Sequence, residues 1–257
     1  KSMKKFNISE LGNLDVGIVS GSGLYGLSNI LSDVIKINYD DIEVLPTVSV
    51  KGHKNYFEAG NLNGLKVIIA NGRFHYYEGL EYDRVSALID IFDQLNCKNI
   101  IITNSSGCLN TNWNKGDIMI VDSHVDMTFR ESSDLGHVIS GNEFYSEKLI
   151  GLARAAMKKI GLPDRVGAYG WVLGPSYETI AEIDLMRTLN IKAVGMSTVP
   201  EIIKAHTLNI PTLTLSCLTN YAAGTNGHIL SHGEVVNSAG KYKDKLIKLI
   251  QGILNSI

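Results

Sequence analysis

The sequence predicts an α/β fold of one domain, in which helices pack on an open or barrel-like sheet. Short runs rich in β-branched residues alternate with amphipathic stretches along the 257 residues, which is the pattern of α/β proteins. The hydrophobic content of 44% supports a substantial core. The sequence shows no repeat, low-complexity tract or linker. We therefore expect a single domain over residues 1–257, with no element assigned to residues 1–3.

Short apolar runs bounded by turn residues are predicted to be strands. One of them, Tyr56–Leu65, is predicted to be a hairpin arm, because Asn61-Leu62-Asn63-Gly64 favours the positive φ angles of a tight turn. The other strand candidates are Asp15–Ser20, Lys66–Ala70, Asn99–Thr103, Asp117–Val121, Gly167–Leu173, Ala193–Met196 and Thr212–Cys217.

Amphipathic stretches between these runs are predicted to be helices. Gly161 and Asn209 are expected to end the helices that precede them. The polar segment Phe129–Asn142, which contains Gly and Ser, is predicted to be a mobile loop. The helix candidates are Tyr82–Asn96, Glu143–Ile160, Glu178–Leu189, Val199–Leu208 and a C-terminal helix from about His232 to Leu254.

Composition excludes several classes of function. The net charge is −2 and no long basic run occurs, which argues against nucleic acid as a partner. No segment approaches the ~20 apolar residues of a membrane span, and the first residues lack the apolar stretch of a signal peptide, so we predict a cytoplasmic protein. Cys97, Cys108 and Cys217 are odd in number and widely spaced, which predicts reduced thiols and no metal site. For Cys108 a packing role is favoured over a catalytic one.

The segment Gly72–Gly79 carries the strongest functional signal. It reads Gly-Arg-Phe-His-Tyr-Tyr-Glu-Gly and directly follows a predicted strand. Arg73 offers a planar fork of donors suited to phosphate, His75 adds a donor, and a tyrosine offers an apolar body with a polar tip. The segment therefore predicts an oxyanion site beside a flat or hydroxylated ligand. The alternative is a surface salt-bridge cluster.

Other motifs also follow predicted strands, and ligands of α/β sheets gather at the carboxyl ends of strands. Gly21-Ser22-Gly23-Leu24-Tyr25-Gly26 matches the dinucleotide fingerprint, with Asp40 or Asp41 at a tolerable distance for the ribose acid. A lone match of this kind is weak, because backbone N–H groups that approach an anion serve inorganic phosphate equally well. The other motifs are Asn104–Gly107, Val172–Thr179, Ala193–Glu201 and Ser216–Asn220.

Taken together, these motifs resemble those of the homotrimeric purine nucleoside phosphorylases, in the same order, from about Val16 to Val235. The resemblance implies a twisted mixed sheet, partly barrel-like, flanked by helices. It also implies cleavage of inosine- and guanosine-type nucleosides by inorganic phosphate, which yields the free base and ribose 1-phosphate. Phosphate would be a co-substrate, and no metal or organic cofactor is expected. The small-molecule partners are then the nucleoside and phosphate, and the expected assembly is a homotrimer.

The resemblance also assigns roles to residues. The catalytic residues would be Asn220, Glu178 and His75, with Glu178 accepting from N1–H of a 6-oxopurine and Asn220 addressing N7 and the 6-oxygen. Each assignment has a structural alternative, such as a first-turn helix acid for Glu178, an exposed loop residue for His53 and a core residue for Met196. The phosphate ligands would be Ser22, His53, Arg73, His75, Ser105 and Ser197, and the nucleoside ligands Tyr77, Ser106, Tyr177, Glu178, Met196, Asn220 and His232.

The chain departs from the family pattern at two places. Ser105 and Ser106 stand where two alanines are usual, so their hydroxyls must find partners. The segment Met127–Tyr145 is shorter than usual, and in the homotrimers it helps to form the neighbouring subunit's site through a Phe, for which Phe129 and Phe144 are the candidates. His206 and His228 are assigned to structure or surface.

Three other functions are weighed against this one. A 5′-methylthioadenosine phosphorylase would need an acid where Asn220 stands. A nucleoside-binding protein without turnover would lack Arg73, His75 and Ser197. A dinucleotide oxidoreductase would bind nicotinamide and be indifferent to phosphate.

Overall fold

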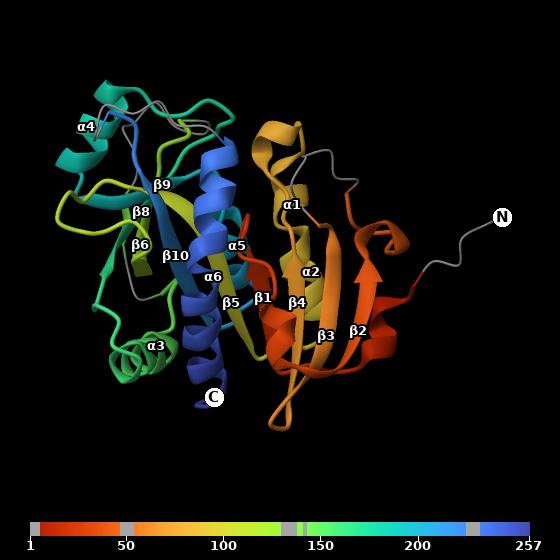
Figure 1. Cartoon of the computed structure of the whole chain (residues 1–257). Coiled ribbons are helices and arrows are strands. Elements are labelled where there is room, and N and C mark those ends of the chain that lie inside the picture. Colours follow the sequence, from red (N-terminus) through yellow and green to blue (C-terminus); the bar gives the residue numbers. More distant parts are fainter. Residues whose placement is uncertain (1–5, 47–53, 130–137, 141–142, 225–231) are drawn as a thin grey trace.

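A mixed sheet of ten strands forms the centre of the molecule within the residues that the structure describes (Figure 1). This computed structural model describes residues 6–46, 54–129, 138–140, 143–224 and 232–257, with side chains described outside 138–140 and 232–241. The strands are β1 (Val16–Ser20), β2 (Ser32–Asn38), β3 (Tyr56–Leu62), β4 (Leu65–Asn71), β5 (Asn99–Cys108), β6 (Ile118–Asp126), β7 (Val138–Ser140), β8 (Val166–Trp171), β9 (Ile191–Gly195) and β10 (Thr212–Tyr221).

The sheet is partly closed. Its strand order is β10-β6-β8-β9-β5-β1-β4-β3-β2, and β7 pairs with β6. Because β10 also pairs with β5, the strands from β10 to β5 in this order close into a barrel. The remaining strands extend from β5 as an open sheet. The fold class predicted from the sequence, a mixed and partly barrel-like sheet flanked by helices, is confirmed.

Strand β5 joins the barrel to the open sheet. Its first half pairs in parallel with β1, and its last residues, Gly107 and Cys108, pair antiparallel with β9. Strand β10 runs parallel beside it, with a bulge between Leu218 and Asn220. Strands β1, β4, β5 and β10 are parallel to one another, so their carboxyl ends meet at one edge of the sheet. This edge is where the polar motifs come together.

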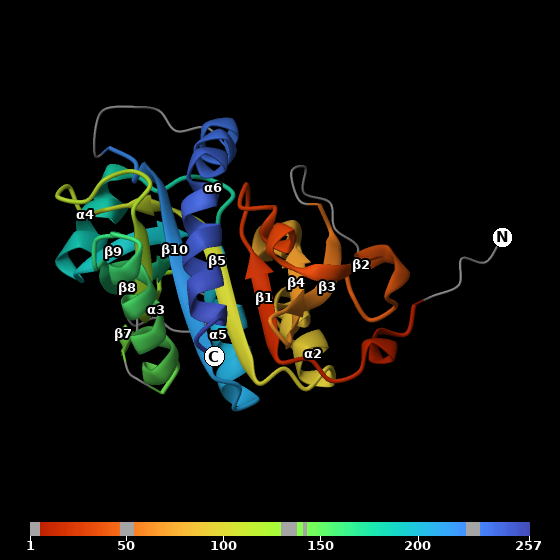
Figure 2. The same cartoon turned by 60° about the horizontal axis from the view of Figure 1, so that its bottom comes forward.

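Helices cover both faces of the sheet (Figures 1 and 2). Apolar residues of α3 and α6 pack on one face with Ile18 and Leu215, and those of α2 and α5 pack on the other with Val19 and Ile102. Gly161 and Asn209 have φ angles of 71° and 56°, so they end α3 and α5 as predicted. The helices are α1 (Tyr82–Val85), α2 (Ala87–Gln94), α3 (Glu147–Lys159), α4 (Ile180–Thr188), α5 (Val199–Thr207) and α6 (His232–Leu254).

Several predicted boundaries are wrong, for physical reasons. The helix predicted over Tyr82–Asn96 is two helices that meet at Ser86, where ψ is 10°. The helix predicted from Glu178 begins at Ile180, because Thr179 caps it and forms a capping box with Glu182. Glu178 therefore lies in the loop before the helix.

Strand lengths also differ from the prediction. Strands β5 and β10 continue five and four residues beyond their predicted ends, to Cys108 and Tyr221, so Asn104–Gly107 and Asn220 lie within strands. The polar side chains of these residues therefore belong to strands at the end of the barrel and not to a loop. Strand β2 was not predicted, because it is an edge strand whose residues are nearly all exposed and so lack alternation. Part of the predicted loop Phe129–Asn142 forms β7, and the rest, beyond Phe129, lies outside the described residues.

The described residues contain no helix long and apolar enough to cross a membrane.

Candidate active site

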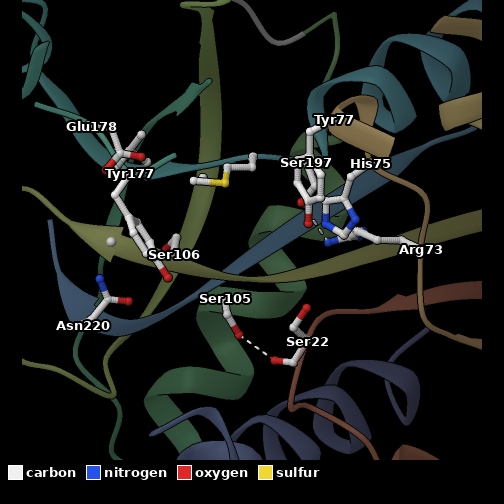
Figure 3. Close-up of a pocket in the computed structure, with 14 residues that line it drawn as sticks. Ser22, Arg73, His75, Tyr77, Ser105, Ser106, Tyr177, Glu178, Ser197 and Asn220 are labelled. Carbon is white, nitrogen blue, oxygen red and sulfur yellow. Dashed lines mark hydrogen bonds between the residues drawn. The ribbon is translucent and has the colours of Figure 1, made fainter. Parts of the chain in front are cut away.

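One pocket lies at the edge of the sheet where β1, β4, β5 and β10 end (Figure 3). It brings together eleven side chains that the sequence predicted as ligands, from segments up to about two hundred positions apart. Strands β5 and β10 supply its floor, and the residues after β1, β4, β8 and β9 supply its walls. The lining residues are Ser22, Arg73, His75, Tyr77, Ser105, Ser106, Gly107, Tyr177, Glu178, Val194, Gly195, Met196, Ser197 and Asn220.

Arg73 is the charged residue at one end of this pocket, and it is only 1% exposed. Its Nη1 donates to the Thr103 carbonyl at 2.9 Å and lies 3.3 Å from Ser197 Oγ. Its Nε donates to Glu201 Oε1 at 3.3 Å, and its Nη2 forms an ion pair with Glu201 Oε2 at 3.0 Å. This Nη2 contact is an ion pair without hydrogen-bond geometry, so the hydrogens of Nη2 make no hydrogen bond in the described structure. An oxyanion that entered the pocket would therefore meet a fixed guanidinium with donor capacity left.

Glu201 is the counter-ion that sequence reasoning missed. It is 1% exposed and lies in the first turn of α5, 128 positions from Arg73. Burial raises the pKa of Glu201, and the adjacent guanidinium opposes that rise. An acid in the first turn of a helix is common because it complements the helix dipole, so its position alone gave no signal. The pair leaves this end of the pocket with less positive charge than Arg73 alone would give it.

The start of α5 shapes the wall beside Arg73. Ser197 and Thr198 precede the helix, and Thr198 has φ 82° and ψ −46°. A positive φ is strained for a β-branched residue. The hydroxyls of Ser197 and Thr198 lie 3.1 Å apart, and Thr198 Oγ1 accepts from Asn104 Nδ2 at 3.0 Å. The strained turn therefore fixes the Ser197 hydroxyl beside the guanidinium.

His75 is held by a neighbouring carboxylate. Its backbone N–H donates to Glu78 Oε1 at 2.7 Å, and its Nδ1 lies 3.3 Å from the same oxygen. Tyr77 stacks on the imidazole with ring centroids 4.8 Å apart. A carboxylate at Nδ1 favours a proton on that nitrogen and fixes the plane of the ring. The sequence predicts no role for Glu78, although it lies in the motif Gly72–Gly79, because an acid three residues from a His is common.

Ser22 lies in a tight turn that the backbone of β5 approaches closely. The Gly21 N–H donates to Thr103 Oγ1 at 3.0 Å, and a Cβ at Gly21 would lie 2.7 Å from Asn104 Cα. The Ser105 hydroxyl donates to the Ser22 carbonyl at 2.8 Å, as Figure 3 shows. The added hydroxyl of Ser105 has thus found a partner. That of Ser106 bonds to Ser216 Oγ at 2.7 Å.

The same turn is not a dinucleotide site. A short 3-10 helix, Leu27–Ile30, and the edge strand β2 follow it, whereas the dinucleotide fingerprint opens a helix between two adjacent parallel strands. Asp40 and Asp41 lie in another 3-10 turn and do not line the pocket. Gly21 serves close packing against β5 instead.

Glu178, Tyr177 and Asn220 form the other end of the pocket (Figure 3). Burial raises the pKa of Glu178. Asn220 Oδ1 accepts from the Thr219 hydroxyl at 2.9 Å, and its Nδ2 donates to the Tyr221 carbonyl at 2.9 Å. One Nδ2 hydrogen and one Oδ1 lone pair of this oriented amide remain for a ligand. These groups are half-buried, in contrast to Arg73.

The middle of the pocket is apolar with a polar rim. A Cβ at Gly174, where φ is 72°, would lie 2.5 Å from Met196 Sδ and 2.9 Å from the Tyr77 ring, so only glycine fits between them. Burial raises the pKa of Tyr77 to about 12, which keeps its phenol protonated and able to donate. The middle therefore suits a ring with hydroxyl groups.

Several predicted residues lie elsewhere. His53 and His228 lie outside the described residues, and His232 begins α6 with its side chain outside them. His206 is partly exposed and contacts the Glu143 carbonyl through Nδ1 at 2.9 Å, which fits the structural role expected of it. Phe144 packs between His124 and His206, with centroids 5.2 and 4.4 Å away, so it is engaged in the fold. Phe129 is 51% exposed beside Tyr177 and Glu178, so it remains the candidate for the phenylalanine that helps to form a neighbouring subunit's site.

The fold and the site define an α/β protein whose pocket has a buried guanidinium at one end and an acid beside an amide at the other, and comparisons with known proteins show its family. The family model of the phosphorylase superfamily matches residues 15–255. Purine nucleoside phosphorylase 1 of Geobacillus stearothermophilus is 36% identical over 94% of this chain and 91% of its own length. The Bos taurus purine nucleoside phosphorylase is 31% identical over 94% and 89%. The chain belongs to the purine nucleoside phosphorylase family, whose members are pentosyltransferases.

Solved structures agree. The purine nucleoside phosphorylase of Schistosoma mansoni in complex with inosine has a TM-score of 0.87 and 27% identity, covering 97% of this chain and 93% of that one. Its complex with adenosine gives the same TM-score and identity.

Proposed function

We propose that the chain catalyses the reversible phosphorolysis of 6-oxopurine nucleosides such as inosine and guanosine, giving the free base and ribose 1-phosphate. The observation that carries this proposal is a single pocket with anion donors at one end and a paired acid and amide at the other. This arrangement suits a reaction in which phosphate attacks one side of a ribose while a purine leaves on the other.

At the phosphate end, Ser22, Arg73, His75 and Ser197 would hold the oxyanion under C1′. Their donors are fixed before phosphate binds, since Arg73 and His75 are each oriented by a carboxylate, Glu201 and Glu78. Fixed donors cost no reorganisation during the reaction. Phosphate is itself the nucleophile and is already an anion at neutral pH, so the proposed reaction needs no metal or organic cofactor.

At the base end, Glu178 would accept from N1–H, and Asn220 would donate to N7 with the Nδ2 hydrogen that its contacts leave over. Negative charge collects on the purine as the glycosidic bond lengthens. A hydrogen bond to N7 therefore strengthens in the transition state, and a bond that strengthens there accelerates the reaction. Tyr77 and Met196 would pack on the ribose, and Tyr177 on the base.

The assembly that fits this site is a homotrimer. Phe129 is exposed on the rim beside Tyr177 and Glu178, where a neighbouring subunit would cover it. Sedimentation of the active enzyme tests this point. A monomer with full activity would contradict both the trimer and a site completed by a neighbour.

The decisive test is hypoxanthine release from inosine with and without phosphate. We expect release only with phosphate, and equal release in phosphate-free buffer would identify a hydrolase instead.

Arg73→Ala should cost about 3 kcal/mol of transition-state stabilisation, roughly a hundredfold in kcat/KM, as for a lost oxyanion donor. Lys98→Ala, which removes an exposed ion pair with Asp15 away from the pocket, is the matched control.

A further inference from the structure

A row of hydrogen-bonded side chains runs behind the pocket from β10 through β5 to the start of α5. It comprises Ser216, Asn104, Thr198, Ser197 and the guanidinium of Arg73. Each of these residues is buried. The proposed function gives Ser197 a role, whereas Thr198, Asn104 and Ser216 have none in it.

The direction of each bond in this row follows from the distances. Ser216 Oγ lies 2.6 Å from Asn104 Oδ1, in the range of O–H···O bonds, and Asn104 Nδ2 lies 3.0 Å from Thr198 Oγ1, in the range of N–H···O bonds. These lengths orient the amide with its oxygen toward Ser216. Ser216 therefore donates to Asn104, and Asn104 donates to Thr198.

Thr198 sets the direction of the next hydrogen bond, which it makes with Ser197. Its oxygen accepts from Asn104 and also lies 3.4 Å from Arg73 Nη1, so its lone pairs face donors. Two groups lie near enough to take its own proton, and only Ser197 Oγ, 3.1 Å away, is in hydrogen-bond geometry, since the Tyr169 hydroxyl makes no hydrogen bond in the described structure. Arg73 Nη1 gives one hydrogen to the Thr103 carbonyl and shares the other between Ser197 Oγ at 3.3 Å and Thr198 Oγ1. Both lone pairs of Ser197 Oγ therefore face donors, namely Thr198 and this shared hydrogen. Its proton must point to another acceptor.

Two acceptors are within reach of that proton. One is an anion in the pocket, which Ser197 lines. The other is the Tyr169 hydroxyl, which is fully buried, has no hydrogen-bond partner in the described structure, and interacts with Ser197 and Thr198. An oxyanion is the stronger acceptor, because bonds to charged groups are about twice as strong as neutral ones. The anion therefore takes the Ser197 proton when it is bound.

From this geometry we infer that Thr198 is a positioning residue, oriented by Asn104, that commits the Ser197 hydroxyl to donate to the phosphate co-substrate. The inference rests on the proposed phosphorolysis. At the strained φ of 82°, the Thr198 hydroxyl lies at the meeting point of Asn104, Arg73 and Ser197.

The test compares Thr198→Val, which keeps the branched shape and removes the hydroxyl, with Thr198→Ser, which keeps the hydroxyl. Thr198→Val should raise the KM for phosphate about tenfold, because a donor to a charged ligand is no longer oriented. Its kcat and its KM for inosine should stay within about threefold, as expected when an interaction present in both ground and transition states is lost. Thr198→Ser should restore the phosphate KM to within about twofold of the wild type.

Matched variants separate this role from a structural one. Thr207→Val removes a hydroxyl from the same helix α5, where it donates to the Ile203 carbonyl within the helix, and should leave every constant unchanged. Tyr169→Phe removes the competing acceptor and should not raise the phosphate KM. Asn104→Leu should raise it in the same direction as Thr198→Val.

Two outcomes would overturn the inference. One is a Thr198→Val enzyme with a wild-type KM for phosphate, whatever its melting temperature. The other is a Thr198→Ser enzyme as impaired as Thr198→Val. Failure of the proposed function looks different, because the wild-type enzyme itself would then release hypoxanthine without phosphate.

Discussion

The two ends of the pocket are built in different ways. At the phosphate end the charges are buried and already paired within the protein, Arg73 with Glu201 and His75 with Glu78. At the base end Glu178 lies half-buried in the loop before α4, and Asn220 uses only part of its amide. The first end is part of the core, and the second is a partly open surface that a ligand completes.

This difference follows from what each end must recognise. Phosphate offers the same oxygens in every orientation, so a rigid set of donors serves it and can be fixed by the fold. A purine is identified by the positions of its donors and acceptors, so the groups that read it must retain unused capacity. We therefore expect changes at the phosphate end to affect folding as well as catalysis, and changes at the base end to affect specificity.

The largest expected effect lies at the base end. Adenine presents N1 as an acceptor and a 6-amino group as a donor, so Glu178 would face a lone pair and Asn220 would lose its carbonyl partner. Buried polar groups left unmatched discriminate by roughly 10⁴. The kcat/KM for adenosine should therefore lie about that factor below the value for inosine.

Asn220→Asp should reduce the difference in kcat/KM between inosine and adenosine. A carboxyl group, once protonated, can donate to N7 and accept from the 6-amino group, so adenosine use should rise while inosine use falls. Equal kcat/KM of the wild type for both nucleosides would show that Glu178 and Asn220 do not read the base in this way.

The second largest expected effect is on stability, and it contrasts Glu201 with Glu178. Glu201→Gln leaves the buried Arg73 unpaired and should lower the free energy of unfolding by about 3 kcal/mol. Glu178→Gln removes a half-buried acid with no ion pair among the described residues and should lower it by less than about 1 kcal/mol.

Urea unfolding of the two variants in phosphate-free buffer measures this contrast. Added phosphate should recover part of the loss in Glu201→Gln, because a ligand that binds only the folded state stabilises it. Equal stability of the two variants would remove the distinction between a core end and an open end.

Local motifs and their places at strand ends could be predicted from the sequence. Arg73, His75, Ser197 and Asn220 stand in long local motifs, and the alternation of strands and helices placed those motifs at strand ends. What the sequence could not supply was the pairing. Arg73 and Glu201 are separated by 128 positions, and no local pattern records that they meet.

The same limit applies to backbone conformation. The strained turn at Thr198 and the continuation of β5 through Asn104–Gly107 depend on contacts with β10 and α5, which are remote in the chain. Strand β2 escaped prediction because an exposed edge has no apolar alternation. The turn at Thr198 and the longer β5 reflect tertiary contacts that override local preference.

A smaller effect concerns pH. Burial raises the pKa of Glu178, and its ionised form is the stronger acceptor for N1–H because a bond to a charged group is about twice as strong as a neutral one. As the pH falls through that raised pKa, Glu178 gains a proton, and kcat/KM for inosine should fall about tenfold per pH unit below it. In Glu178→Gln the activity should be lower and this acid limb should be absent. An unchanged limb in the variant would assign the titration to another group.

The smallest expected effect lies at Ser105, beside the turn of the phosphate end. Its hydroxyl donates to the Ser22 carbonyl at 2.8 Å and so anchors the turn that presents Ser22 to phosphate. A hydrogen bond of this kind contributes about 1 kcal/mol net, and the partly exposed site lets water replace part of it. Ser105→Ala should therefore lower kcat/KM for phosphate about threefold and leave the preference for inosine over adenosine unchanged.

Ser123→Ala is the matched control for this change, because its hydroxyl also makes a 2.8 Å bond in a partly buried position, to Asp122, outside the pocket. It should leave kcat/KM for phosphate unaltered. The two variants assayed at varied phosphate and fixed inosine give the comparison. A Ser105→Ala enzyme with altered base preference would contradict the separation of the two ends, since Ser105 bonds to the phosphate turn at Ser22 and makes no hydrogen bond with Glu178 or Asn220 in the described structure.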